Sequence, residues 1–204
     1  MNGINRVFKR HVENNLLKYV TAVLVFAAGV VLGVFSAMGC PAETAEAVTN
    51  DIQSVCTDMP SADLDTMKIL ETSLVKNLRN FLIIFSGGFS VWLVPVPFAV
   101  LLTSGFSYGF TIGCMTVAFG ADGFAMAFSS ILFNLLLTVP VYIILTVLAV
   151  NHSLKRSRGR AESGDFAGYV ICFAALFVLI IPAMLADAFI VPEIIRQICT
   201  NMQF

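Results

Sequence analysis

Five apolar stretches, each close to the length of a membrane-crossing helix, constrain this chain more than any other feature. A helix needs about 20 residues to cross the hydrocarbon core of a bilayer. The stretches cover residues 19–38, 78–94, 97–119, 124–150 and 169–190. One globular core could not bury a chain that is 58% hydrophobic and only 12% charged. The sequence therefore predicts an all-α, polytopic membrane protein, with residues 1–204 forming one bundle of about five helices.

Short connections join the central stretches. Pro95 and Pro97 lie between the second and third stretches; proline lacks a backbone N–H and disfavours helical geometry in the preceding residue. We interpret this segment as a tight turn, with a single kinked span as the alternative. Residues 120–123 read Gly-Ala-Asp-Gly, a composition typical of turns, so a short turn is expected between the third and fourth stretches.

The basic residues predict which ends of the helices face the cytoplasm. Residues 1–18 and 151–168 together hold eight of the twelve Lys and Arg residues. Five spans place both segments on one side, and the positive-inside rule makes that side the cytoplasm. Residues 39–77 carry seven acidic and two basic residues, which indicates an extracytoplasmic segment. The tail, residues 191–204, is then expected to be extracytoplasmic as well.

Amphipathic helices are expected in the extracytoplasmic segment and in the tail. Ser61 is the expected N-cap of one of them, with acidic residues in the first turn. Such helices either lie against the membrane and the bundle or dock an extracytoplasmic partner. The apolar residues at helical spacing are Leu64, Met67, Leu70, Leu74, Ile194 and Ile198. Cys40 and Cys56 could pair in this segment, and the sequence leaves that question open.

Residues 105–113 read GFSYGFTIG and admit two interpretations. The first five residues match G-x-S-x-G, the nucleophile elbow of serine hydrolases, which needs a strand, a sharp turn and a helix. Ser107 instead lies mid-stretch, about 15 Å of helix rise from the cytoplasmic face, where His11 and His152 are expected. We therefore predict that the chain is not an enzyme. Without a Walker motif, an H-E-x-x-H motif or a metal-ligand cluster, no cofactor or metal is expected.

The second interpretation is a packing face on a membrane helix. Helices in lipid associate largely by van der Waals packing, and small residues let their backbones approach closely. Small residues recur at a spacing of four in the first and third stretches, and others cluster in the second. The expected packing residues are Gly29, Gly33, Gly87, Gly88, Gly105, Gly109 and Gly113. The spacing does not decide between a contact within one chain and a contact in a homo-oligomer.

The fourth stretch contains an amide, Asn134, that needs a hydrogen-bond partner in hydrocarbon. We expect it to join two helices through a backbone group or a hydroxyl of the third stretch. The candidate hydroxyls are those of Thr103, Ser104, Ser107 and Thr111. Pro140 is expected to kink the same helix. Arg79, at the outer entrance of the second stretch, is expected to reach toward the membrane surface or to pair with Asp122 or Asp187.

Three segments carry a family resemblance: KNLRNFLIIFSGG, LVPVPFAVLLTSGFSYGFTIGCMTVAFG and DGFAMAFSSILFNLLLTVPVYI. They resemble the stage II sporulation protein M family of endospore-forming bacteria. The matching residues are Asn77, Gly87 or Gly88, Pro95, Gly105, Gly109, Phe110, Gly113, Gly123, Phe124, Asn134 and Pro140. The second proline, Pro97, and the acidic extracytoplasmic segment depart from the family pattern.

The resemblance implies a role in engulfment, when the mother-cell membrane migrates around the forespore. It implies a non-enzymatic scaffold in the mother-cell membrane at the sporulation septum. The implied partners are the peptidoglycan-degrading stage II sporulation proteins D and P, with the lipid bilayer around the bundle and no nucleic acid. The alternative is a permease subunit, since glycine-rich, broken helices also suit a substrate path. The lack of an inverted repeat and of a deep intramembrane charge argues against that alternative.

Overall fold

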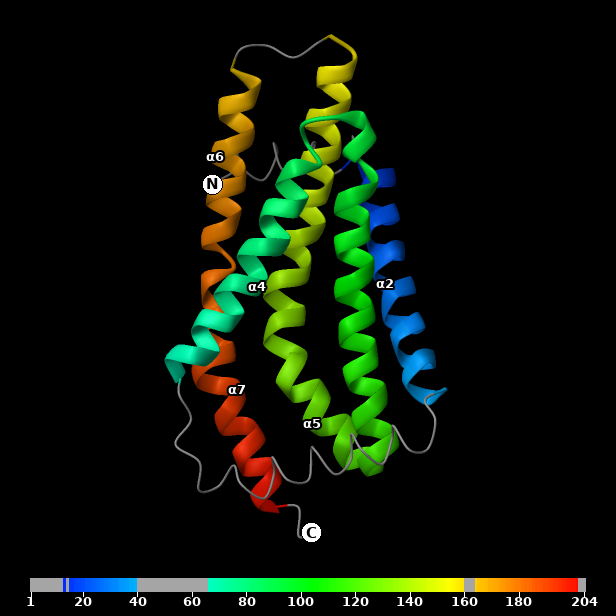
Figure 1. The fold of residues 1–204 in the computed structure, drawn as a ribbon, viewed down its shortest axis with the longest axis vertical. Helices are drawn as coiled ribbons and strands as arrows, with labels where there is room; N and C mark the ends of the chain where they lie inside the picture. The colour runs from blue at the N-terminus through cyan, green and yellow to red at the C-terminus, as the bar shows by residue number, and fades with distance from the viewer. Residues whose placement is uncertain (1–12, 14, 40–65, 160–163, 202–204) are drawn as a thin grey trace.

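The computed structural model describes residues 13, 15–39, 66–159 and 164–201, which fold into helices and the turns between them (Figure 1). No strand occurs in these ranges. The all-α fold predicted from the sequence is therefore confirmed. The helices are α2 (Leu16–Met38), α4 (Thr66–Ser86), the 3-10 helix η1 (Val91–Leu93), α5 (Pro95–Ser157), α6 (Asp165–Val178) and α7 (Ile181–Asn201).

Within the described residues, four helical segments are long and apolar enough to cross a membrane. They are Leu16–Met38, Val91–Ala121, Asn134–Ser157 and Asp165–Glu193. The chain is accordingly a multi-pass membrane protein. The second apolar stretch of the sequence, residues 78–94, is not a separate helix. Most of it belongs to α4, and the rest forms the turn and η1 that follow. Although α4 runs along the bundle with the other helices, its composition excludes it from the four, since it carries Lys68, Glu71, Lys76 and Arg79.

Helix α4 also merges two elements that the sequence separates. The expected outer helix before residue 77 and the apolar stretch after it form one continuous helix, Thr66–Ser86. The polar residue at the expected boundary, Asn77, does not interrupt the helix. Its side chain is buried, and its amide donates to the Ser73 carbonyl oxygen at 2.9 Å. Hydrogen bonding inside the bundle thus lets a polar residue stay in a helix interior.

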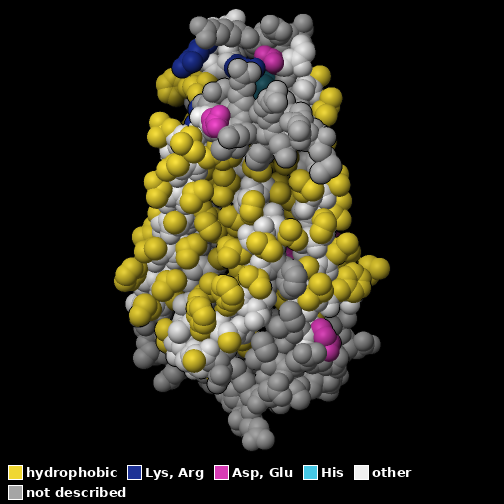
Figure 2. Space-filling view, turned by 180° about the vertical axis from the view of Figure 1, so that it is seen from behind, with side chains coloured by type: hydrophobic (Ala, Val, Ile, Leu, Met, Phe, Trp, Pro, Cys, Tyr) yellow, Lys and Arg dark blue, Asp and Glu magenta, His cyan; other side chains and the backbone are white. Residues whose placement is uncertain are grey.

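Successive helices alternate in direction along the bundle from α2 to α6, and α7 continues in the direction of α6 (Figure 1). The first turns of α2 and the last turns of α5 lie at the same end. We call this the basic end, because it carries Lys18, Lys155, Arg156 and Arg158. Figure 2 shows Lys and Arg side chains gathered there, beyond a broad hydrophobic band. The opposite end, where α2 ends and α4 begins, is called the far end.

Two turns reverse the chain around the first half of α5, residues 95–119. The first follows α4 through Gly87 and Gly88, and Pro95 then begins α5. A tight turn, not one kinked span, therefore joins these segments. The second turn lies at Gly120, whose φ of 62° and ψ of −133° suit glycine alone. After it, residues 121–157 form the second half of α5, and Pro140 lies inside that helix.

The last apolar stretch is broken near its middle. Helix α6 ends at Val178, and the N–H groups of Leu179 and Ile180 bond to carbonyls three residues earlier. Pro182 follows in the first turn of α7 and has no N–H to donate to Val178. The proline thus explains why a stretch that reads as one helix folds as two.

The second half of α5 is the centre of the bundle. Half of the apolar window of Asn134–Ser157 is buried, against 22% of the window in α2. The rings of Phe85, Tyr169 and Phe173 pack together where α4 and α6 meet, with centroids 4.5–5.2 Å apart. The core consists of Ala22, Ile84, Val100, Leu101, Val141, Tyr142, Leu145, Ala149, Tyr169, Phe173, Ile180 and Met184.

A Gly120→Ala variant is expected to unfold more easily, by about 1–3 kcal/mol, because a β-carbon disfavours the positive φ at this turn. Nothing lies within 4 Å of the position that the β-carbon would take, so any loss comes from the backbone. The measurement is thermal unfolding in detergent. Gly39→Ala is the matched control at the same end, where φ is −89°. Equal shifts for the two variants would contradict the turn geometry.

Candidate functional site

Glycines bring the backbones of α2 and the first half of α5 into direct contact. A β-carbon on Gly29 would collide with the Leu102 carbonyl oxygen, and one on Gly33 would collide with the Phe106 carbonyl oxygen. From the other side, a β-carbon on Gly105 would meet the Phe26 carbonyl oxygen. The obstructing atoms are backbone, which cannot move aside as a flexible side chain can. Only glycine therefore permits this helix separation at these positions.

The contact continues to the far end along one face of each helix. A β-carbon on Gly109 would strike the Val30 carbonyl, and one on Gly113 would lie 2.6 Å from the Ala37 β-carbon. Ala22, Gly29, Gly33 and Ala37 are the buried residues of α2, and all are small. Both helices belong to the same chain, so the contact needs no second copy.

The other two expected packing glycines lie elsewhere. Gly87 and Gly88 follow the end of α4 and belong to the turn, not to a helix face. A β-carbon on Gly87 would collide with the Pro97 ring, and one on Gly88 would collide with the Tyr169 hydroxyl. Their small size therefore serves the tight passage of the chain between α5 and α6. Sequence spacing missed this role because the helix end was expected beyond residue 88.

Ser107 lies in the first half of α5, within a run of helical backbone, and its side chain is exposed. A nucleophile elbow requires a sharp turn between a strand and a helix, and this geometry differs from it. His152 is not a partner of Ser107 either. It lies at the basic end, with Nδ1 2.9 Å from the Gly88 carbonyl oxygen and its ring stacked on Tyr169.

A hydrogen-bonded cluster of polar side chains joins three helices inside the bundle. Asp187 of α7 is at its centre. Its Oδ2 accepts hydrogen bonds from Ser73 Oγ of α4 at 3.0 Å and from Asn134 Nδ2 of α5 at 2.5 Å. We call this the interior polar cluster; its members are Ser73, Asn77, Asn134, Thr138, Tyr142 and Asp187.

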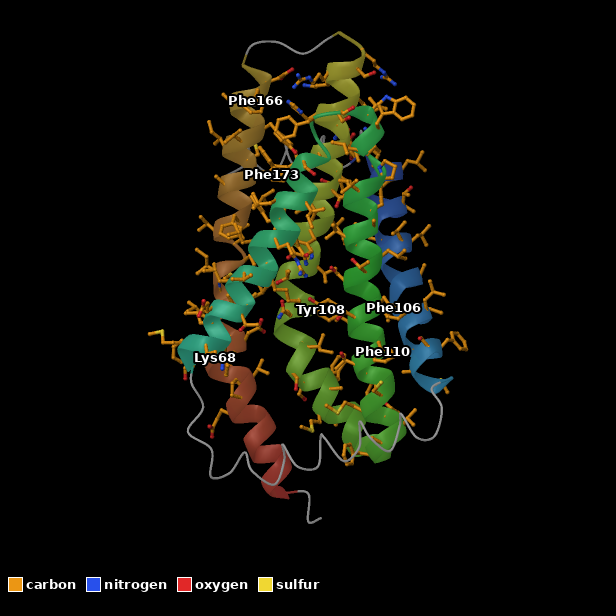
Figure 3. All side chains as sticks on the ribbon, viewed as in Figure 1. Lys68, Phe106, Tyr108, Phe110, Phe166 and Phe173 are labelled. Carbon is orange, nitrogen blue, oxygen red and sulfur yellow. The ribbon has the colours of Figure 1, made fainter. Side chains whose placement is uncertain are left out.

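The remaining members extend the cluster in both directions. Thr138 Oγ1 donates to Asn134 Oδ1 at 2.9 Å, and Tyr142 OH donates to Asn77 Oδ1 at 2.8 Å. Tyr108 projects from the first half of α5 into the bundle (Figure 3) and lies under Lys76 Nζ, 5.9 Å from the ring centroid. Lys76 also interacts electrostatically with Asp187. The Asp187 carboxylate thus accepts two hydrogen bonds and has one cation near it.

These partners differ from those expected for Asn134. Its amide bonds to Asp187 and Thr138, whereas Thr103 and Thr111 bond to carbonyls of their own helix turns. Threonine in a helix commonly bonds this way, which removes it as a partner for a neighbouring helix. Asn134 also lies on the second half of α5 and faces α7, an element whose position the sequence does not reveal.

Asp187 departs from two expectations. It accepts hydrogen bonds from Ser73 and Asn134 rather than pairing with Arg79, and it bonds toward the bundle interior. The sequence signal for this cluster was the spacing of its polar residues. One helix turn separates Ser73 from Asn77, and one separates Asn134 from Thr138. The Asp122 side chain lies outside the described part of the chain.

The expected docking residues fall into three groups. Met67 and Leu74 are exposed on α4, by 75% and 42%, whereas Leu70 packs against the core. Ile194 and Ile198 belong to α7, but their side chains lie outside what the structure describes. Leu64 and the Cys40–Cys56 pair also lie outside the described residues. Figure 3 shows Lys68 beside the exposed start of α4 at the far end.

No group of three or more His, Cys, Asp or Glu side chains in the described ranges could hold a metal ion. The arrangement offers a close helix contact and a partly buried carboxylate that is hydrogen-bonded to two other helices. Such a carboxylate can join helices, and it can also take up a proton or a cation.

The family model described as Stage II sporulation protein M matches residues 22–192. That range includes the whole glycine contact and every member of the interior polar cluster. No curated protein and no solved structure matches the chain.

A double-mutant cycle tests the bond between Asn134 and Asp187. Asn134→Leu and Asp187→Leu are each expected to destabilise the bundle, and together by less than the sum. The expected coupling is about 0.6–1.7 kcal/mol, the size measured for hydrogen bonds between membrane helices. The measurement is unfolding in detergent. Thr103→Val is the control for a hydrogen bond that does not join two helices. The Thr103 hydroxyl bonds to carbonyls of its own helix, at 3.0 Å and 3.1 Å. Strictly additive losses for the first pair would contradict the cluster.

Proposed function

The chain belongs to the stage II sporulation protein M family, and on that premise we propose that it is a non-enzymatic scaffold for engulfment. Family membership makes it a sporulation-related membrane protein. The proposed scaffold recruits and localises peptidoglycan-degrading proteins on the extracytoplasmic side. Its proposed partners, from the family resemblance, are the stage II sporulation proteins D and P. Its proposed location is the mother-cell membrane at the sporulation septum.

The observation that carries this proposal is the outward surface of α4. Apolar side chains and one carboxylate are exposed there: Met67, Glu71, Leu74, Val75 and Leu78. We call these residues the α4 outer face. Lipid tails do not accommodate an exposed carboxylate, whereas protein interfaces commonly mix apolar and charged groups.

Helix α2 provides the contrast within the same chain. After Lys18 it carries no charged residue, and its outward residues include Leu24, Leu32 and Phe35, each more than half exposed. That surface suits the lipid bilayer. The α4 outer face is therefore better suited to a protein partner.

The side of α4 opposite the outer face is anchored in the bundle. On this side, Ser73 bonds to Asp187 and Asn77 bonds to Tyr142. Leu70, which lies nearer the start of the helix than Ser73, packs against the core. A surface fixed before binding loses less conformational entropy when a partner docks, which favours affinity. The interior polar cluster thus supports the scaffold function without touching the partner.

A permease subunit is the second candidate function, and Asp187 is the observation that favours it. Its carboxylate lies within the span Asp165–Glu193 and bonds into the bundle interior. Membrane-embedded carboxylates mark ion and proton pathways in many transporters. The scaffold remains our preferred proposal, because every hydrogen bond that Asp187 accepts serves to join α7 to α4 and α5.

A Met67→Gln variant is expected to weaken binding of the outer domains of proteins D or P by about fivefold or more, the effect of losing an anchor residue. The measurement is pull-down on the full-length protein in detergent, quantified by titration. Met38→Gln is the matched control. Met38 is also a methionine at the far end, but it belongs to α2. It is 67% exposed, against 75% for Met67. Equal weakening by both variants would contradict docking on α4.

A complementation assay separates the two candidate functions. Asp187→Asn keeps an oxygen that can accept from Ser73 and Asn134 but removes the charge. A scaffold with this change should still support engulfment in a sporulating deletion strain. A permease that depends on the carboxylate should not, and stalled membranes with normal protein levels would support that alternative.

A further inference from the structure

A cavity of about 570 Å³ opens at the basic end between the start of α2, the end of α5 and the start of α6. Its volume falls within the range of about 300–1,000 Å³ that is usual for ligand sites. It is separate from the interior polar cluster and from the α4 outer face, and neither the scaffold role nor the permease role uses it.

The cavity wall has an excess of positive charge. Lys18, Lys155 and Arg158 line it, and among the described residues of the lining Asp165 carries the one carboxylate. Asp165 is paired with Lys155, at 3.5 Å from Nζ to Oδ1. Lys18 donates instead to neutral oxygens, those of Asn15 and Asn151. Lys18 and Arg158 also lie close enough to repel each other. A bound anion would relieve that repulsion.

Two further groups in the wall are suited to a phosphate. The Asn151 amide nitrogen is buried and has no hydrogen-bond partner among the described residues. Buried donors are normally satisfied, by protein, water or ligand. Helix α6 begins at the cavity, and Gly164 gives it no side-chain cap. The first N–H groups of a helix favour an anion, which adds to the charge of the basic side chains.

The cavity becomes apolar toward the middle of the bundle. Leu148 and Cys172 line its inner part, each seven residues along its helix from the ion pair of Lys155 and Asp165. Seven helical residues correspond to about 10 Å along the bundle. Cys172 is exposed and adjoins Ile171, which is 67% exposed. The site thus offers charge at the membrane surface and an apolar wall beneath it.

We propose that this cavity binds the phosphate of an anionic phospholipid, with Lys18 and Arg158 as the phosphate ligands. The acyl chains run along the apolar wall beside Leu148 and Cys172. Basic pockets between membrane helices bind acidic headgroups in this manner. The polar rim and the apolar inner wall together match an amphiphile, whereas a free phosphate would use the rim alone. The site would stabilise the contact of α6 with the rest of the bundle.

The test uses the purified full-length chain in an uncharged detergent. Phosphatidylglycerol, phosphatidylcholine, glycerol 1-phosphate and inorganic phosphate are titrated separately, and binding is followed by thermal stability and by native mass spectrometry. Phosphatidylglycerol is expected to bind at least tenfold more tightly than phosphatidylcholine. The two water-soluble phosphates are expected to leave the melting temperature unchanged at millimolar concentration. Full stabilisation by either soluble phosphate would contradict a lipid site.

Arg158→Gln is expected to weaken phosphatidylglycerol binding about tenfold, the loss of one charge-assisted hydrogen bond. Arg156→Gln is the matched control, since Arg156 is an exposed arginine two residues before Arg158, in the last turn of α5, but does not line the cavity. Its expected change is under twofold. Lys18→Gln provides a second variant should Arg158→Gln fail to fold. Equal losses for Arg156→Gln and Arg158→Gln would show attraction by overall charge alone and would overturn the proposal.

Discussion

The close contact between α2 and the first half of α5 is the constraint on which the rest of the bundle depends. Hydrophobic burial does not draw helices together in lipid, so a stable pair must gain van der Waals contact along its length. The glycines provide that contact, because carbonyl groups of each helix occupy the space where β-carbons would be. With α2 fixed there, the second half of α5 is left to contact α4, α6 and α7 as the central helix.

The opposite side of the bundle is held by a different interaction. Helix α4 is too polar to bind its neighbours by small-residue packing alone, and it is joined to α5 and α7 through Ser73, Asn77 and Asp187. Hydrogen bonds suit this role because a buried polar group in a membrane needs a partner. This arrangement lets α4 keep charged residues on its outer side, where the proposed partner docks, while its inner side remains part of the bundle.

Much of this fold follows from local sequence signals. The all-α membrane fold was predictable from apolar stretches, and the turns were predictable from Pro95, Pro97 and the Gly120 segment. Errors arose wherever tertiary contacts override local signals. Asn77 reads as a boundary, yet hydrogen bonds keep it inside a helix. Asp187 reads as a residue near the membrane surface, yet α4 and α5 supply its donors. The packing of helices distant in sequence decides these positions, and one sequence does not reveal it.

The most direct measurement is a disulfide across the glycine contact within one chain. Ala37→Cys and Gly113→Cys are introduced into a chain whose native cysteines are replaced, with a protease site inserted between residues 41 and 64. The two β-carbons would start 2.6 Å apart, and a disulfide places them about 3.8 Å apart, so a small shift at the end of α2 suffices. The account predicts that oxidation holds the two fragments together as a monomer, and that Met38→Cys paired with Gly113→Cys does not. A cross-linked dimer, or equal linkage of the Met38 pair, would contradict it.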